Sequence, residues 1–119
     1  MIDDTSIDFE FTHNVANNGL KLKLDYSRNL IMVFKEIYNN ILKHAKATTV
    51  TVDMNLTPEN TLIIHIADNG IGFDAAVVQR GNGIKNIKNR VSRMNGEVTV
   101  TSVKNEGTKK VIVLKDIFV

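Results

Sequence analysis

A row of four polar residues along one predicted helix is the first place in this sequence where chemistry could occur. Within the segment EIYNNILKHA, residues 36–45, the row consists of Glu36, Asn40, Lys43 and His44. Because each residue turns an α-helix by about 100°, the four side chains fall within an arc of roughly 100° beside the apolar face of the helix. The spacing therefore indicates a polar row at the border of the core, where the rim of a pocket would lie.

Two interpretations of this polar row are open on the residues alone. Most charged residues on helices are solvated and have no further role. The same residue types also suit a magnesium–nucleotide site, because Mg²⁺ takes hard oxygen ligands such as the side-chain carbonyl of Asn40. Lys43 and His44 could then contact phosphate oxygens, and Glu36 could orient or deprotonate a water or a hydroxyl group.

A second candidate is the segment IIHIADNGIGFD, residues 63–74, in which an apolar run ends on Asp68 and is followed by Gly70 and Gly72. Asn-Gly is a strong signal for a hairpin turn, because both residues tolerate positive φ. Taken alone, the segment favours such a turn. The reason for an acidic residue at the end of a buried strand then stays open.

A third candidate is the pair Gly81 and Gly83, which stands just before a predicted helix in the segment RGNGIKNIKN. The first turn of a helix offers free backbone N–H groups and the positive end of the helix dipole, and glycine lets the backbone approach an anion. Lys85 and Lys88 add positive charge. The alternative is a flexible loop before a basic surface helix, since neither of the familiar phosphate-binding glycine patterns is present.

The chain has the size and composition of one folded domain. Its 119 residues are 43% hydrophobic and 24% charged, which allows a real core and excludes a disordered chain. A net charge of +2 is too small to indicate nucleic-acid binding, and the absence of cysteine excludes disulfides and thiolate metal sites. No apolar stretch approaches the roughly 18 residues of a membrane span, and the acidic start has no signal-peptide pattern, so we expect a cytoplasmic domain.

Hydrophobic periodicity predicts two amphipathic helices that would position these candidates. The first covers residues 27–47 with Ser27 as its N-cap, and the second covers residues 84–95 with Gly96 as its C′ residue. Their expected core faces are Leu30, Phe34, Ile37, Tyr38, Ile41 and Ala45 in the first helix, and Ile84, Ile87, Val91 and Met94 in the second.

Alternating apolar residues predict about six strands, mostly joined as hairpins. We expect the first hairpin to have Asn18-Gly19 in its turn, and the segment 73–83 to be mainly loop. The three predicted hairpins are formed by residues 7–13 with 20–25, by 48–56 with 61–68 across the turn 57–60, and by 97–103 with 108–119 across 104–107.

Two helices and about six strands predict an α/β, or α+β, two-layer sandwich in which one sheet carries both helices on one face. Because consecutive strands are mostly linked as hairpins, the sheet should be mixed and largely antiparallel. A doubly wound fold would need more helical crossovers.

Four motifs in a fixed order resemble the ATP-binding domain of the GHKL superfamily, which includes sensor histidine kinases, gyrase, mismatch-repair ATPases and heat-shock chaperone ATPases. The motifs are EIYNNILKHA, DNGIGF, GNGI and EGT, and the resemblance runs from about Leu24 to Leu114. The segment GIKNIKNRVSRMNGEVTVTS is most similar to histidine kinases. The resemblance implies the GHKL ATPase fold, with ATP and Mg²⁺ as ligands.

For the first two motifs, the resemblance implies a role for each matched side chain. Asn40 matches the residue that binds Mg²⁺, and Lys43 and His44 match positions near the phosphates. Glu36 matches the acid that activates water in relatives that hydrolyse ATP, which makes it the candidate catalytic residue. Asp68 matches the acid that accepts a hydrogen bond from the adenine amino group.

The glycines and the last motif also match positions of the family. Gly70 and Gly72 match the glycines that let adenine lie against the backbone. In the last motif, the hydroxyl of Thr108 is expected to support Asp68 through water. The remaining matches are Gly81 and Gly83 as glycines of the lid near the phosphates, and Gly107 as the glycine before Thr108.

The resemblance also implies that a partner domain is missing. Histidine kinases phosphorylate a histidine on a separate helical dimerisation domain, and none of His13, His44 and His65 precedes an antiparallel pair of helices. The segment between Phe73 and Gly81 is short for a lid. We therefore expect residues 1–119 to be the single catalytic domain of a larger kinase, unable to phosphorylate itself alone, with a response regulator downstream.

Two other functions fit the same motifs. A stand-alone anti-sigma-type serine kinase also consists of one GHKL domain, although the segment from Glu97 to Ser102 is less similar to that branch. A non-enzymatic ATP-binding module is the other alternative, although the matched motif positions hold competent residues. A role in nucleic-acid binding would rest on the mild positive charge and one basic helix alone, so we expect none.

Overall fold

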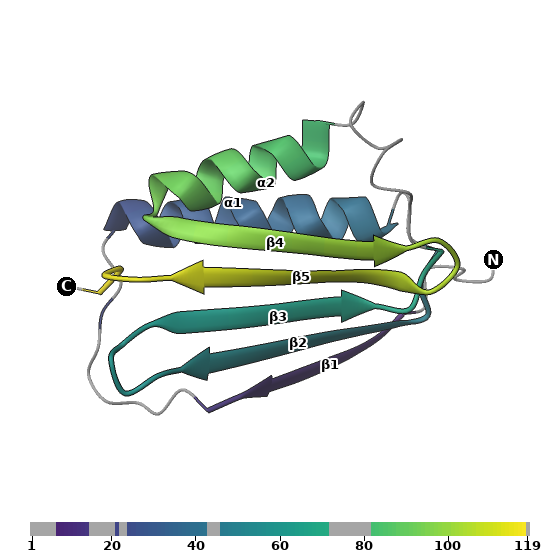
Figure 1. Cartoon of the computed structure of the whole chain (residues 1–119), viewed down its shortest axis with the longest axis horizontal. Coiled ribbons are helices and arrows are strands. Elements are labelled where there is room, and N and C mark those ends of the chain that lie inside the picture. The colour runs from purple at the N-terminus through teal and green to yellow at the C-terminus, as the bar shows by residue number, and fades with distance from the viewer. Residues whose placement is uncertain (1–6, 15–20, 22–23, 43–45, 72–81, 119) are drawn as a thin grey trace.

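Five strands and two helices make up the part of the chain that the computed structural model describes, which is residues 7–14, 21, 24–42, 46–71 and 82–118. The sheet has the strand order β1-β2-β3-β5-β4, and Figure 1 shows the strands side by side in this order. The elements in chain order are β1 (Asp8–His13), α1 (Leu24–Asn40), β2 (Thr49–Leu56), β3 (Leu62–Asp68), α2 (Asn82–Arg93), β4 (Gly96–Val103) and β5 (Gly107–Leu114).

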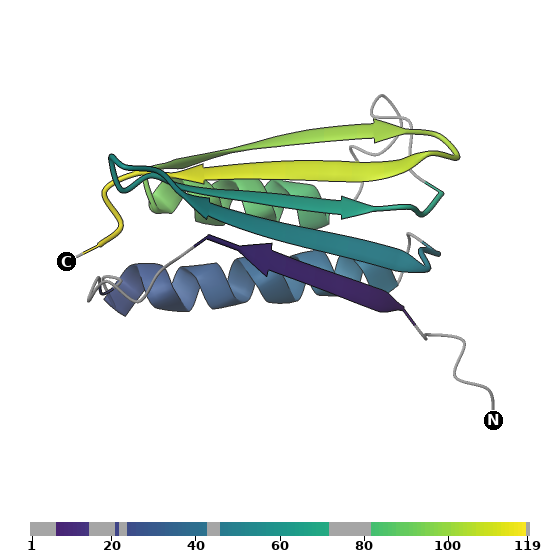
Figure 2. The same cartoon turned by 90° about the horizontal axis from the view of Figure 1, so that it is seen from below.

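The predicted architecture is confirmed. Strands β1 and β2 pair in parallel, and the three other pairs are antiparallel, so the sheet is mixed and largely antiparallel. Both helices lie on the same side of the sheet (Figure 2). The hairpins β2–β3 and β4–β5 form as expected, with turns at residues 57–61 and 103–107.

The core lies between the sheet and the two helices. On β3, the side chains of Leu62, Ile64 and Ile66 alternate toward the helices and are buried, as the period of two predicts. Val33 of α1 and Val91 of α2 are fully buried against them. Burying each such side chain stabilises the fold by about 1.5–3 kcal/mol, which fixes the helices above the sheet.

The predicted first hairpin is wrong. Strand β1 pairs in parallel with β2, from Asp8 opposite Thr49 to His13 opposite Met54, so α1 forms a crossover between them. Leu24, which was expected in a strand, is the first residue of α1. Phe9 of β1 also packs against Tyr38 of α1, with ring centroids 5.8 Å apart. The expected turn at residues 18–19 lies outside the described residues.

Helix α1 begins three residues before the expected N-cap, so Ser27 lies inside the helix. Tyr26 explains the extension: it packs against the core, and its hydroxyl accepts a hydrogen bond of 2.9 Å from Nδ2 of Asn95. This contact joins the first turn of α1 to the turn between α2 and β4. Tertiary packing therefore outweighs the local capping signal.

At the end of α2, the residue with the left-handed conformation is not the one that we predicted. Asn95, with φ 57°, takes the left-handed conformation that we expected at Gly96, and Gly96 opens β4 instead. Gly96 is needed for space, because a Cβ there would lie 2.5 Å from Cδ2 of Leu114 and 2.8 Å from the carbonyl oxygen of Val113. At the same end of the hairpin, β5 stops at Leu114, opposite Gly96, rather than continuing to residue 119.

The expected core faces are largely confirmed. Within α1, Tyr38 is exposed although it was expected in the core, and Val33 is buried although it was not. Residues 45 and 84 have no described side chain. None of the described helices is long and apolar enough to cross a membrane.

Candidate functional site

The candidate residues come from elements that meet at one end of the molecule. Figure 1 shows the C-terminal end of α1, the C-terminal end of β3, the N-terminal end of α2 and the start of β5 at the same end. Asn40 is the last residue of α1, Asp68 is the last residue of β3, and Gly107 is the first residue of β5. The fold therefore gathers four segments that are far apart in the sequence.

Asp68 is half-buried at the end of β3, on the face that the helices cover. Its Oδ1 accepts a hydrogen bond of 2.9 Å from the backbone N–H of Gly70. Within the described part of the chain, this amide is the one donor to the carboxylate. The second oxygen can therefore accept a hydrogen bond from a ligand.

The hairpin interpretation of Asn69-Gly70 is wrong. Neither residue has the positive φ that a type I′ turn requires. Asn69 instead holds the start of β2: its Oδ1 accepts hydrogen bonds of 2.9 Å from the N–H groups of Thr48 and Thr49, and its Nδ2 donates to Oγ1 of Thr48 at 2.9 Å. Sequence reasoning missed this contact, because nothing local to Asn69 identifies a partner 20 residues away.

Gly107 supports Asp68 from the neighbouring strand. Its φ is 102°, and a Cβ at this position would overlap the carbonyl oxygen of Asp68 and lie 3.2 Å from Cα of Asn69. The turn before β5 also bonds to the segment that follows β3, because the backbone N–H of Asn105 donates a hydrogen bond to the carbonyl oxygen of Ile71. The last motif therefore needs glycine for close backbone approach as well as for its φ.

Thr108 faces the same side as Asp68, its partner across β3 and β5, and is only 7% exposed. Its Oγ1 lies 2.8 Å from Oγ of Ser102, and Ser102 also donates to the carbonyl oxygen of Gly107 at 3.2 Å. Either hydroxyl can donate in the Ser102–Thr108 pair, and Thr108 Oγ1 keeps a lone pair for another donor in either case. Ser102 was missed, although its position opposite Thr108 follows from the β4–β5 hairpin.

The polar row on α1 is partly described. Glu36 and Asn40 are half-buried, whereas their neighbours Lys35 and Asn39 are exposed, so the row borders the core as its spacing predicts. Directly after Asn40 the helix widens to π geometry, a feature that is frequent at functional sites. Lys43 and His44 lie outside the described residues.

The described part of the chain contains no cluster of three or more acidic or histidine residues that would form a metal cage. The side-chain carbonyl of Asn40 is nevertheless a hard oxygen donor of the kind that Mg²⁺ accepts. A single protein ligand of this type fits an ion that is held mainly by phosphate oxygens and water. The donor set therefore fits a magnesium–nucleotide complex better than a free ion.

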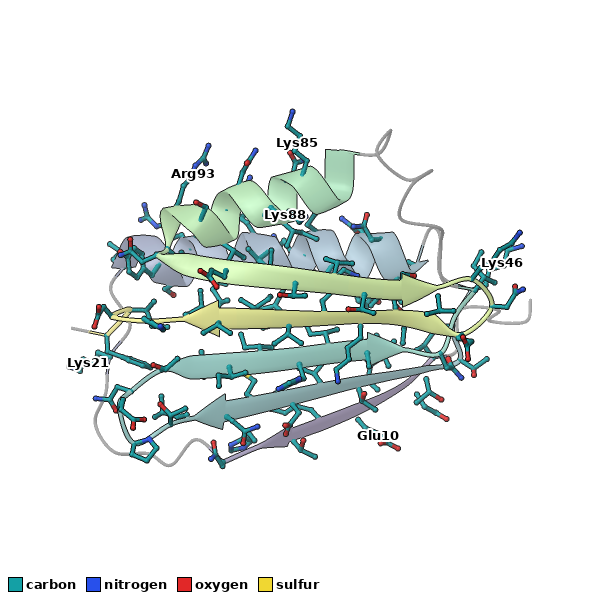
Figure 3. The ribbon with its side chains drawn as sticks, viewed as in Figure 1. Glu10, Lys21, Lys46, Lys85, Lys88 and Arg93 are labelled. Atoms are coloured by element: carbon teal, nitrogen blue, oxygen red, sulfur yellow. The ribbon has the colours of Figure 1, made fainter. Side chains whose placement is uncertain are left out.

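Helix α2 offers its N-terminus to the same end of the fold. The helix begins at Asn82, so Gly83 lies inside its first turn rather than before it. Lys85 and Arg93 project from α2 away from the sheet (Figure 3), and Lys88 is also exposed. Their charges therefore face solvent. Gly72 and Gly81 lie outside the described residues.

Lys110 is a residue of this region that sequence reasoning missed. It lies on the buried face of β5, two residues after Thr108, and is only 5% exposed. Burial lowers the pKa of Lys110 from the ordinary value of 10.5, and the nearby charge of Asp68 opposes this shift. The alternation of Ile112 and Leu114 on the same strand places Lys110 on the inner face and could have identified it.

Comparisons with known proteins agree with this arrangement. The model of the family described as histidine kinase-, DNA gyrase B-, and HSP90-like ATPase matches residues 25–117. The chain is 28% identical over 106 residues to the sensor histidine kinase ComP of Bacillus subtilis, covering 87% of this chain and 14% of ComP. It is 29% identical over 110 residues to the sensor histidine kinase YdfH of the same organism, covering 82% of this chain and 27% of YdfH.

A solved structure shows the same fold. The histidine kinase domain of the blue-light activated histidine kinase EL346 from Erythrobacter litoralis matches with a TM-score of 0.75 at 17% identity, covering 92% of this chain and 51% of that chain. The curated relatives described above are much longer, and this chain spans less than a third of each.

Proposed function

The chain belongs to the family of histidine kinase-, DNA gyrase B-, and HSP90-like ATPases, and we propose that it is the Mg-ATP-binding catalytic domain of a sensor histidine kinase. The γ-phosphate of ATP would pass to a histidine on a separate helical dimerisation domain and then to a response regulator. Residues 1–119 would form one domain of that larger kinase, on the cytoplasmic side.

The main observation behind the proposal is that Gly107 and Thr108 of the last motif lie beside Asp68. Gly107 lets β5 approach the carbonyl of Asp68, and Thr108 lies opposite it with its hydroxyl held by Ser102. These contacts hold the backbone around Asp68 at the end of β3, and the described residues donate to only one of its two carboxylate oxygens. Such an acceptor suits an exocyclic amino group, so we assign Asp68 to the adenine amino group, with Gly70 and Gly72 beside the base.

The phosphates would lie between the ends of α1 and α2. The first turn of α2, with Gly83, offers the phosphates N–H groups that have no partner within the helix, together with the positive end of the helix dipole. We assign Lys43, His44 and Gly81 to the same phosphates. Asn40 would hold Mg²⁺, which neutralises charge on the β- and γ-phosphates, and Glu36 would orient water or the attacking group.

Removing the magnesium ligand should abolish the dependence of ATP binding on Mg²⁺. We expect Asn40→Ala to bind Mg-ATP roughly tenfold or more weakly than the wild-type chain, because losing one ligand to a charged group costs about 1.5 kcal/mol or more. Calorimetric titration with ATP, with and without Mg²⁺, measures the effect. Asn39→Ala is the matched control, because Asn39 is exposed on the neighbouring face of α1.

A folded wild-type chain that does not bind ATP would contradict the proposed function. Equal loss in the Asn39 and Asn40 variants would instead show that the helix end tolerates no change, and the magnesium assignment would fail.

The chain alone should not acquire acid-labile phosphate from labelled ATP, because we assign the acceptor histidine to a separate domain. Addition of the helical phosphoacceptor domain of the parent kinase should produce acid-labile phosphate on that domain. Scintillation counting after acid and alkali treatment distinguishes phosphohistidine from phosphoserine. Acid-labile phosphate on the chain alone, lost in a variant of His13, His44 or His65, would contradict the expectation. Acid-stable phosphate on a partner protein would favour a serine kinase.

A further inference from the structure

Lys110 occupies an inward-facing position of β5, where an apolar side chain is expected. The next two inward positions, Ile112 and Leu114, are fully buried, and Lys110 has the same orientation with 5% of its surface exposed. Lysine is almost never buried to this extent unless its charge is paired. The residue therefore needs an explanation beyond packing.

Asp68 is the group that the Lys110 side chain can reach. Lys110 stands opposite Ile66 in the β3–β5 pair, and Asp68 is the diagonal neighbour on the same face of the sheet. A diagonal neighbour in an antiparallel pair lies about 7–8 Å away, which is within reach of a long side chain. The effect of the Asp68 charge on the pKa of Lys110 agrees with this proximity.

The described residues give the ammonium group of Lys110 no hydrogen bond or ion pair. The carboxylate of Asp68 accepts from Gly70, and no bridge to Lys110 is formed. Burial of the side chain disfavours the charged form of Lys110, so the lysine costs stability in the empty domain. A residue that costs stability in the free protein is expected where a ligand uses it.

The chemistry of a purine base fits this pair of side chains. Adenine presents an amino group and, directly beside it, the ring nitrogen N1, so its edge offers one donor and one acceptor. A carboxylate next to an ammonium group offers the complementary acceptor and donor. Guanine presents a carbonyl oxygen and a protonated N1 at the same two places, which reverses the pattern.

We propose that Lys110 is a base-recognition residue, which donates a hydrogen bond to N1 of adenine while Asp68 accepts one from the amino group. This inference rests on the proposed nucleotide site and adds a second contact to the base. The contact is charge-assisted and shielded from solvent, so it contributes affinity and favours adenine over guanine.

The test compares two ligands and two proteins. The wild-type chain and Lys110→Met are each titrated with Mg-ATP and with 1-deaza-ATP, in which N1 is replaced by a C–H group. Methionine keeps an unbranched side chain that is one atom shorter, and it removes the charge. We expect the variant to bind ATP about tenfold more weakly than the wild-type chain, and both proteins to bind 1-deaza-ATP equally.

Thermal unfolding of the empty proteins separates a binding role from a structural one. Lys110→Met should raise the melting temperature, because it removes a buried charge. Lys109→Met, one residue earlier on the exposed face of β5, is the matched control and should leave ATP affinity unchanged. A lower melting temperature for Lys110→Met would indicate a structural role and contradict the proposal.

The outcomes also separate this inference from the proposed function. If the wild-type chain binds ATP but Lys110→Met binds it equally well, or loses ATP and 1-deaza-ATP to the same extent, Lys110 does not contact N1 and only this inference fails. If the folded wild-type chain binds neither ligand, both fail.

Discussion

Replacing Asp68 with asparagine should weaken ATP binding by at least about a hundredfold and leave the fold intact. The amide oxygen can still accept the hydrogen bond from Gly70, so the local turn is kept. The amide nitrogen then stands where a carboxylate oxygen would accept from the adenine amino group. The introduced amide nitrogen and the adenine amino group are both donors, so they cannot form a hydrogen bond. A site built to form a hydrogen bond rejects a ligand that cannot form it by about a hundredfold or more.

Calorimetric titration with Mg-ATP measures the effect, and urea unfolding checks the fold. Asp53→Asn is the matched control, because Asp53 is a strand carboxylate whose oxygens accept from Thr12 and Asn55 away from the site. Purine riboside triphosphate, which lacks the amino group, should bind weakly to the wild-type chain and gain nothing from Asp68. ATP affinity within a few-fold of wild type in Asp68→Asn would remove the adenine assignment.

The parts of the fold that the sequence predicts correctly depend on short-range patterns. The β2–β3 and β4–β5 hairpins need only two alternating segments and a turn between them, so their register follows from neighbouring residues. The pairing of β1 with β2 joins Asp8 to Thr49, which lies beyond a whole helix. Local alternation cannot distinguish that crossover from a hairpin.

The residues of the candidate site also divide into those that the local sequence identifies and those that depend on contacts with distant residues. Glu36, Asn40 and Asp68 carry side chains whose chemistry is informative by type, and the fold gathers their elements at one end (Figure 1). Asn69 acts through contacts with Thr48 and Thr49, which only the folded chain brings near, so residue type alone could not identify it. Ser102 could have been identified, because the predicted β4–β5 hairpin places it opposite Thr108.

Lys110 is a different case, because its inward position follows from strand alternation that the sequence already contains. The segment TKKVIVL has two adjacent lysines, and one of them must face the core if Ile112 and Leu114 do. A charged residue at an inward position contradicts the local pattern. Such contradictions are expected at functional sites, where stability is given up for binding.

Gly107→Ala should be the most destabilising substitution in the turn before β5. We expect a loss of about 3 kcal/mol or more in the free energy of unfolding, because alanine is strained at φ 102° and its Cβ overlaps the carbonyl oxygen of Asp68. Urea unfolding followed by circular dichroism measures the loss. ATP affinity should fall as well in the fraction that stays folded, since the overlap displaces the backbone of Asp68.

Asn105→Gly is the control for Gly107→Ala, because it lies in the same turn and should act in the opposite direction. Asn105 has φ 68°, a conformation that glycine adopts without strain, so this variant should be neutral or up to about 1 kcal/mol more stable. If both variants lose stability, the turn depends on side-chain contacts rather than on backbone space. If Gly107→Ala is as stable as the wild-type chain and still binds ATP, β5 does not hold the Asp68 carboxylate in place. The adenine site would then depend on β3 and its own turn at Gly70 alone.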